Sequence, residues 1–277
     1  MARTLEGQRV LVVGASAGIG REFALQSVRD GATVLLAARR LDRLEALAEE
    51  AGGVVPVVVD ITDPDSCAAL TDAVRSEVGE VDLVVCSAGY SPLRHFVDAS
   101  PQDWQRVLEI NVIGIHQMIR AVLPVTKEGG LIAVMSSEST SAPRHALGVY
   151  TSSKAALEMS MRVWRQEQPR ARFTTLVVGG TFPTDFGADF DMDILLPAME
   201  AWARIGTIQE KLMDTAEVAS VIRGALTSIV DLPDISIDQV VIRSPSPVIG
   251  GAEQLKAEAE ENIGRLQESA AEAPTTG

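Results

Sequence analysis

The hydrophobic positions of this chain fall into short, nearly unbroken runs, separated by longer segments in which apolar residues recur every three or four positions. The run Arg9–Val13 is typical, because it is rich in valine, shows no polar alternation and stops at a glycine. Such runs predict strands buried on both faces, whereas the longer segments predict amphipathic helices. We therefore expect strands at Arg9–Val13, Thr33–Ala38, Val54–Val59, Val81–Cys86, Gly130–Ser136, Arg172–Val178 and Ser236–Ile242.

Helical segments alternate with these strands along most of the chain. An alternation of buried strands and helices requires a parallel sheet covered on both faces, so we predict an α/β fold with a doubly wound, seven-stranded parallel sheet flanked by helices. The helices are expected at Gly18–Asp30, Leu41–Ala51, Pro64–Val78, Pro101–Val125 and Val149–Glu167, with a further helical region over Asp193–Val230.

The domain organisation follows from the same alternation. No linker and no internal repeat interrupts it before Gly250, which predicts one domain over residues 1–250. Residues 251–277 differ, because they are acidic and rich in alanine. We expect this C-terminal segment to be either a docked amphipathic helix or a frayed tail. Its apolar residues near helical spacing are Leu255, Ala259, Ile263 and Leu266.

Composition narrows the class of protein. A chain of 277 residues with 46% hydrophobic content can bury a large core. It shows neither a run of about 20 apolar residues nor an apolar segment at the start, so we expect no membrane span and no secretory signal. Two cysteines without metal-ligand spacing predict a reducing, cytoplasmic location and no metal. The net charge of −14 argues against nucleic acid and anionic membranes as partners.

The first expected strand runs directly into a glycine-rich turn that opens a helix. Glycines let the backbone approach a pyrophosphate closely, and the free amides of the helix N-terminus attract its charge. A glycine cluster alone also fits an ordinary tight turn, but its place between strand and helix favours a dinucleotide site of the Rossmann type. The expected contacts are Gly14, Ser16, Ala17, Gly18, Ile19 and Gly20.

Tyr150 and Lys154 stand four residues apart in an expected helix, and Ser137 precedes the tyrosine by thirteen residues. A four-residue offset places the ammonium beside the phenol on one helix face. The positive charge favours ionisation of the phenol, which would let the pair exchange a proton near neutral pH. A tyrosine and a lysine on a solvated helix face give the same spacing, so the other motifs decide its meaning.

The glycine loop, Ser137, Tyr150 and Lys154, in this order on a chain of seven alternating strands, resemble the classical short-chain dehydrogenase/reductase family over roughly Glu6 to Ser244. The chain departs from the family pattern at Val13, at Cys86-Ser87 and at Gly179, where side-chain hydrogen bonds or a proline are usual. The resemblance implies further cofactor contacts at Asp60, Ile61, Ala88, Gly89, Gly180, Thr181, Phe182 and Thr184, beside Tyr150 and Lys154.

The resemblance also implies roles for four residues in hydride transfer between a nicotinamide and a carbonyl carbon. Tyr150 would give or take the proton, and Ser137 would donate a hydrogen bond to the same oxygen. Lys154 would hold the nicotinamide ribose and lower the proton affinity of the tyrosine, while Asn111 would bind a water linking the lysine to solvent. Alternatives remain: Asn111 could only cap or kink its helix, and Ser137 could only bond backbone at a strand end.

The second strand carries the signal for cofactor preference. An acidic residue near its end bonds a ribose 2′-hydroxyl, whereas a basic residue accommodates a 2′-phosphate. Here Ala38 takes the acidic position, and Arg39 and Arg40 follow. We expect NADP(H), with Arg39 the main contact, Arg40 nearby and Ser16 assisting, rather than NAD(H). The other possibility is that these arginines only solvate a helix start.

The substrate is expected to be a neutral, largely apolar ketone or secondary alcohol. Apolar residues are dense between Phe186 and Leu196, in a segment that by resemblance forms a lid, and the interleaved aspartates would repel phosphates. These apolar residues could instead only pack the lid onto the domain. A 3-oxoacyl-thioester reductase and a non-catalytic NADP-sensing regulator are the rival functions, and a homodimer or homotetramer is expected from the resemblance. Candidate substrate contacts are Tyr90, His145, Phe182, Phe186 and Phe190.

Overall fold

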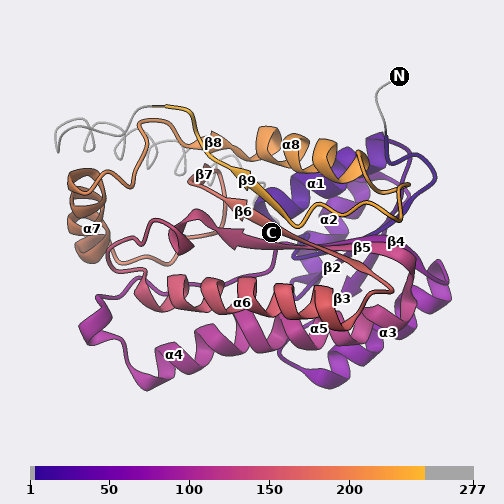
Figure 1. The fold of residues 1–277 in the computed structure, drawn as a ribbon, viewed down its shortest axis with the longest axis horizontal. Coiled ribbons are helices and arrows are strands. Elements are labelled where there is room, and N and C mark those ends of the chain that lie inside the picture. The colour runs from indigo at the N-terminus through magenta and orange to yellow at the C-terminus, as the bar shows by residue number, and fades with distance from the viewer. Residues whose placement is uncertain (1–3, 247–277) are drawn as a thin grey trace, which may run out of the picture.

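The structure is a computed structural model that describes residues 4–246. It contains a parallel sheet of seven strands in the order β3-β2-β1-β4-β5-β6-β9, so the predicted doubly wound α/β fold is confirmed (Figure 1). The acidic C-terminal segment, residues 251–277, lies outside the described residues. The strands are β1 (Arg9–Val13), β2 (Thr33–Ala38), β3 (Val55–Val58), β4 (Val81–Cys86), β5 (Thr126–Ser137), β6 (Arg172–Val178) and β9 (Gln239–Ile242).

Helices cover both faces of the sheet, as continuous apolar strands require. One face packs under α1 (Gly18–Arg29), α2 (Leu41–Ala51) and α8 (Thr215–Thr227). The other packs under α3 (Pro64–Glu77), α5 (Ile115–Val122) and α6 (Gly148–Glu167). Figure 1 shows the two helical layers on opposite sides of the strands.

The predicted helix Pro101–Val125 is continuous in space but not regular. α4 (Pro101–Leu108) passes through a π-helical segment, Glu109–Gly114, into α5 and a final 3₁₀ turn. By length and composition this stretch could cross a membrane, but the core helix of a protein without a membrane span meets the same criterion, so the expectation of no membrane span stays a prediction. Its apolar residues have another use in the fold, because α5 buries them against the sheet and α3.

The predicted helical region Asp193–Val230 is wrong in its middle. It is two helices, α7 (Met192–Arg204) and α8, separated by a short strand, β8 (Met213–Asp214), which pairs with β7 (Thr181–Phe182). The Asp214 side chain accepts hydrogen bonds from the first free amides of α8 and so fixes where that helix begins. The β7–β8 ribbon holds the segment after β6 near the carboxyl edge of the sheet.

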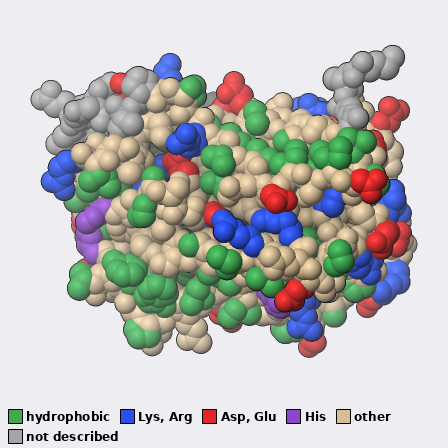
Figure 2. All heavy atoms as spheres, in the orientation of Figure 1, with side chains coloured by type: hydrophobic (Ala, Val, Ile, Leu, Met, Phe, Trp, Pro, Cys, Tyr) green, Lys and Arg blue, Asp and Glu red, His purple; other side chains and the backbone are tan. Residues whose placement is uncertain are grey.

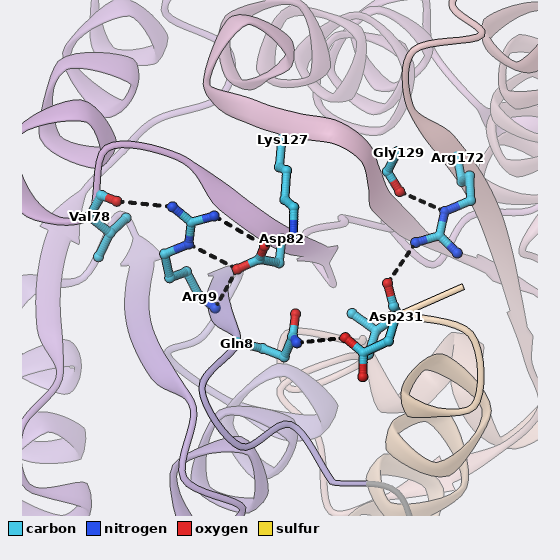
Figure 3. Close-up of polar contacts among 9 residues, drawn as sticks. Gln8, Arg9, Val78, Asp82, Lys127, Gly129, Arg172 and Asp231 are labelled. Carbon is cyan, nitrogen blue, oxygen red and sulfur yellow. Dashed lines mark hydrogen bonds and ion pairs between the residues drawn. The ribbon is translucent and has the colours of Figure 1, made fainter. Parts of the chain in front are cut away.

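A polar network closes the opposite edge, at the amino ends of the strands (Figure 3). Asp82 accepts three hydrogen bonds from Arg9, and Lys127 lies 3.2 Å from the same carboxylate. Nearby, the buried Arg172 donates to the carbonyls of Gly129 and of four residues after α8, which ties the end of that helix to the sheet. A guanidinium offers five donors in a fixed fork, so it suits this convergence of carbonyls.

Replacing Asp82 by asparagine is expected to lower the free energy of unfolding by about 1–3 kcal/mol at pH 7, because the Arg9 guanidinium loses its ionised partner. Burial opposes ionisation of Asp82, but hydrogen bonds from Arg9 and Lys127 outweigh it and hold the carboxyl pKa below its ordinary value of 3.8. The stabilisation is therefore present above that value and is lost as the pH falls through the lower, folded-state pKa.

Urea denaturation at pH 7 and at pH 3 measures this effect. The difference between the variant and the parent should be largest at pH 7 and smaller at pH 3. Asp72→Asn is the control, since Asp72 also pairs with an arginine but its side chain is 79% exposed. If Asp82→Asn and Asp72→Asn lower the free energy of unfolding equally, the Asp82 network stabilises the fold no more than an exposed ion pair does.

Candidate functional site

The glycine loop lies at the carboxyl edge of the sheet, between β1 and α1. Gly14 has a φ of +86°, and a Cβ at this position would stand 2.7 Å from the Ala88 amide nitrogen. Gly18 has a φ of +56°, a conformation that side chains other than glycine rarely adopt. The N-cap residue of α1, Ala17, offers no side-chain acceptor to the first amides of the helix. This arrangement leaves the first backbone amides of α1 without a side-chain acceptor at the N-cap, which suits a pyrophosphate.

Ser87 holds this loop in place. Its hydroxyl lies 3.0 Å from the carbonyl oxygen of Gly14 and 3.3 Å from that of Val13, so β4 is tied to the loop after β1. The sequence comparison with the family pattern suggested that Val13 and Cys86 lose such a tie. Ser87 supplies one from the adjacent position, which the sequence analysis did not predict, although its place directly after the fourth strand could have indicated it.

Ser137, Tyr150 and Lys154 meet at the same edge of the sheet. Ser137 ends β5, while Tyr150 and Lys154 lie one turn apart at the start of α6. The lysine is buried, its Nζ donates to the carbonyl of Met135 at 2.9 Å, and it lies 5.8 Å from the centre of the Tyr150 ring. A Cβ at Gly89 would stand 3.4 Å from Lys154 Nζ, so the loop after β4 passes close to the ammonium.

Burial dominates the pKa values of the pair. Burial raises the pKa of Tyr150 to about 12, although the Ser137 hydroxyl and the charge of Arg144 act in the opposite direction. Burial also lowers the pKa of Lys154 to about 8. Sequence spacing predicted that the lysine lowers the proton affinity of the phenol. In the protein alone, burial is the largest influence on the Tyr150 pKa and the Lys154 ammonium donates to Met135, so this effect of the lysine stays a prediction.

Asn111 lies in the π-helical segment and is fully buried. Its Oδ1 accepts from the Tyr90 amide, and its Nδ2 donates to the Tyr90 carbonyl and to the Ser153 hydroxyl. The Ser153 hydroxyl in turn donates to the carbonyl of Tyr150. Asn111 thus clamps the loop after β4 to α6 in the described structure, and π-helical turns often occur at functional sites.

The two arginines after β2 point to different places. Arg40 donates to the Ser16 hydroxyl at 2.9 Å, so it is Arg40 that reaches the glycine loop. Arg39 instead lines a hollow of about 420 Å³ beside Thr62. Burial opposes ionisation of Asp60, but hydrogen bonds from Thr62 and the charge of Arg39 hold the pKa of its carboxyl below the usual value. The choice of Arg39 as the main 2′-phosphate contact stays a prediction, and the contacts favour Arg40.

Aromatic residues of the segment after β7 reach Tyr150. The ring of Phe186 lies 5.1 Å from that of Tyr150 and 5.5 Å from that of Phe190. Phe190 also packs against a third apolar cluster formed by α7 and the loop before α6, together with Ile194 and Leu195. Part of the apolar segment therefore packs the lid onto the domain, as the alternative proposed, while Phe186 remains 47% exposed beside the tyrosine.

The other candidate substrate contacts are more dispersed. The Tyr90 ring lies under the Arg106 guanidinium at 4.6 Å, and His145 is exposed with its ring against His95. Phe182 is in β7, paired with Asp214. No hydrogen bond or ring contact joins any of these three side chains to Tyr150 within residues 4–246, so their part in substrate binding stays a prediction.

Glu138 and Arg144 form a buried ion pair that sequence reasoning missed. Glu138 directly follows Ser137, and a Cβ at Gly179 would stand 2.7 Å from its Oε2. The absence of the usual proline at Gly179 therefore makes room for this carboxylate. Arg144 also donates to the Thr207 carbonyl and lies over the Trp202 ring, which connects the segment after β5 to the end of α7. The glycine at position 179, where the family usually has proline, was the sequence feature that could have indicated this ion pair.

A family model described as short chain dehydrogenase matches residues 8–193, which contain the glycine loop, Ser137, Tyr150 and Lys154 in the arrangement described above. The chain belongs to the classical short-chain dehydrogenase/reductase family. Among solved structures, this short-chain dehydrogenase is similar to an alcohol dehydrogenase from the archaeon Thermococcus sibiricus complexed with 5-hydroxy-NADP. The TM-score is 0.73 at 27% identity, covering 87% of this chain and 97% of that one.

Curated relatives agree on the family but differ in activity. The chain is 36% identical over 162 residues to a short chain dehydrogenase of Pseudocercospora fijiensis, covering 55% of this chain and 52% of the relative. It is 32% identical over 200 residues to 11-beta-hydroxysteroid dehydrogenase-like 2 of Arabidopsis thaliana, covering 66% and 65%. A glycine betaine reductase of Emericella nidulans matches at 32% identity over 69% of this chain but only 16% of its own length. The short-chain dehydrogenase thus spans less than two thirds of these three relatives.

Proposed function

We propose that this short-chain dehydrogenase interconverts a ketone and a secondary alcohol with NADP(H), using Tyr150 as the general acid and base. The observation that carries the proposal is the meeting of Ser137, Tyr150 and Lys154 beside the glycine loop, at one edge of the sheet. Ligands of open α/β sheets bind at the carboxyl ends of the strands, which is where these residues lie.

Each residue contributes an action that its chemistry allows. When bound, the nicotinamide supplies or accepts the hydride. Tyr150 carries its proton at neutral pH, since its pKa is about 12, and gives that proton to the carbonyl oxygen in reduction. Ser137 stabilises the same oxygen by donating a hydrogen bond. Lys154 stays protonated below its pKa of about 8 and presents its charge to the ribose side of the site.

The rival functions have less support. A nucleotide-sensing regulator needs the glycine loop but has no use for a tyrosine, serine and lysine set at the same edge of the sheet. An acyl-thioester reductase handles a carrier or nucleotide whose phosphates would meet the acidic segment around Asp189, Asp191 and Asp193.

Cofactor preference provides one prediction. Arg40→Ala is expected to weaken NADP(H) binding at least about tenfold and to leave NAD(H) binding unchanged, because only the 2′-phosphate needs the guanidinium. The presence of Ala38 in place of an acidic residue supports the same preference, as does the 5-hydroxy-NADP in the archaeal neighbour. Dissociation constants for both cofactors, with the exposed Arg75→Ala as control, measure the effect. Equal or better catalytic efficiency of the parent with NAD(H) would contradict the preference.

Substrate class provides a second prediction. We propose a neutral, largely apolar ketone or alcohol, of which a steroid-like or aromatic ketone is an example. The aromatic pair Phe186 and Phe190 lies beside Tyr150, and the charge of Arg144 is neutralised by Glu138. Catalytic efficiency should be higher on a hydrophobic ketone than on a β-ketoacyl coenzyme A of similar chain length at low salt. Clear preference for the thioester would refute this substrate class and leave the catalytic assignment intact.

We further propose that the protein is a cytoplasmic homo-oligomer. Exposed apolar side chains on the π-helical segment and on α6, namely Ile113, Met159 and Val163, support an interface with a second copy. On the face shown in Figure 2, apolar side chains gather in patches among interspersed acidic and basic ones. Sedimentation velocity measures the oligomeric state, and a monomer at micromolar concentration would contradict it. The two buried, unpaired cysteines fit a reducing compartment.

A further inference from the structure

Three consecutive residues after β7 reach three separate parts of the site. Thr184 lies over the glycine loop, 3.5 Å from where a Cβ at Gly18 would stand. Asp185 accepts hydrogen bonds from Arg40 at 2.7 Å and from Arg43 at 2.8 Å. The ring of Phe186 packs on the ring of Tyr150. Residues 183–190, which we call the strap, therefore connect the arginines beside Ser16 with the catalytic tyrosine.

The Asp185 carboxylate is an anion that can take the place of a phosphate. Its carboxylate binds the same Arg40 guanidinium that also donates to Ser16, and this is the place where a basic residue and the glycine loop would receive a ribose 2′-phosphate. Both partners of the pair are about half exposed, with side-chain exposures of 42% for Arg40 and 47% for Asp185. Such a pair is weak and is readily exchanged for a stronger anion.

We propose that Asp185 competes with the cofactor 2′-phosphate for Arg40 and Arg43, so that only a phosphate-carrying cofactor releases the strap from Tyr150. This inference rests on the proposed NADP(H) preference. Asp185 thereby becomes a residue that determines specificity, because a cofactor without the 2′-phosphate leaves the carboxylate in place and Phe186 over the tyrosine.

The charges of the two anions indicate that the arginines bind the phosphate in preference to the Asp185 carboxylate. A phosphate monoester carries about −1.5 to −2 charges and three acceptor oxygens, against one charge and two oxygens on a carboxylate. Once the phosphate occupies the arginines, repulsion between two adjacent anions favours departure of Asp185. Hydrogen bonds within the strap, from the Phe186 amide to Thr184 Oγ1 and from the Ala188 amide to the Asp185 carbonyl, make Asp185 and Phe186 move together.

Calorimetry with cofactor fragments tests the competition without relying on turnover. The unsubstituted chain of 277 residues and its variants Asp185→Asn and Asp189→Asn are titrated with adenosine 2′,5′-bisphosphate and with adenosine 5′-monophosphate. Asp185→Asn should bind the bisphosphate about three- to tenfold more tightly than the parent and the monophosphate equally well, because the competing anion is gone. Asp189 is the control, since it lies in the same strap and forms no ion pair with any residue of the described range.

Amide hydrogen exchange of residues 183–190 tests the release. In the parent, exchange should increase when the bisphosphate is added and stay unchanged with the monophosphate, whereas Asp185→Asn should exchange fast without any nucleotide. If the parent prefers the bisphosphate but Asp185→Asn binds it no better, the competition is refuted and the proposed cofactor stands. If the parent binds both fragments equally and Arg40→Ala changes neither, both proposals are refuted.

Discussion

Tyr150→Phe is expected to lower kcat by at least about 10²-fold while leaving the cofactor dissociation constant unchanged. The substitution removes only the hydroxyl, which the proposed mechanism uses to protonate the carbonyl oxygen, and lost acid–base catalysis typically has this magnitude. The ring remains in contact with Phe186, so packing of the strap should persist. Steady-state kinetics and cofactor titration of the same preparation measure the two quantities.

The tyrosine itself can be titrated as a check on this assignment. Its pKa of about 12 in the free protein predicts that ultraviolet difference spectra show no ionisation of Tyr150 below about pH 10. Thermal unfolding of Tyr150→Phe should match that of the parent, which separates a chemical effect from a folding defect. Near-normal turnover of the variant would mean that Tyr150 is not the acid.

Lys154→Met is expected to have two opposite effects. Turnover and cofactor affinity should both fall, because the ammonium serves the ribose side of the site. The free energy of unfolding at pH 7 should rise by about 1–3 kcal/mol, because the substitution removes a buried charge whose pKa burial lowers to about 8. Activity and stability thus oppose each other at one residue, as functional sites often show.

The pH dependence of this gain has a definite sign. Below about pH 8 the lysine is charged in both the folded and the unfolded states, so the cost of burying the charge is fully present. Between pH 8 and the ordinary value of 10.5 the unfolded chain holds more protons than the folded one, so the parent gains stability as the pH rises. The advantage of Lys154→Met should therefore shrink over this range in urea denaturation.

A lysine on the surface gives the control for both effects. Lys211 is exposed, and Lys211→Met should change neither turnover nor the free energy of unfolding appreciably. If Lys154→Met is less stable than the parent at pH 7, the hydrogen bond to the Met135 carbonyl outweighs the cost of burying the charge.

The strap adds a reason why cofactor and substrate sites should influence each other. Asp185 and Phe186 are neighbours in sequence, yet one contacts the arginines after β2 and the other covers the tyrosine of α6. Any change that frees Asp185 should also uncover the space above Tyr150. Substrate affinity is then expected to depend on whether the cofactor carries the 2′-phosphate.

The sequence by itself determined the fold class of this protein and identified the residues expected to act in its chemistry. Unbroken apolar runs such as Val81–Cys86 can only be buried on both faces, and their alternation with helical periodicity leaves the doubly wound sheet as the solution. The four-residue offset of Tyr150 and Lys154 fixed their proximity, because it depends on local helix geometry alone. Glycine at positions 14 and 18 was equally readable, since both adopt positive φ angles.

The tertiary structure alone decided which partners those residues contact and how their pKa values shift. Whether Arg39 or Arg40 meets Ser16, and whether Asp185 joins them, depends on loops from distant parts of the chain meeting at one edge of the sheet. Periodicity carries no information about such meetings. The Glu138–Arg144 pair and its space beside Gly179 arise in the same way. Even the pKa of Tyr150 follows from burial rather than from its neighbour in sequence, because desolvation depends on everything packed around the ring.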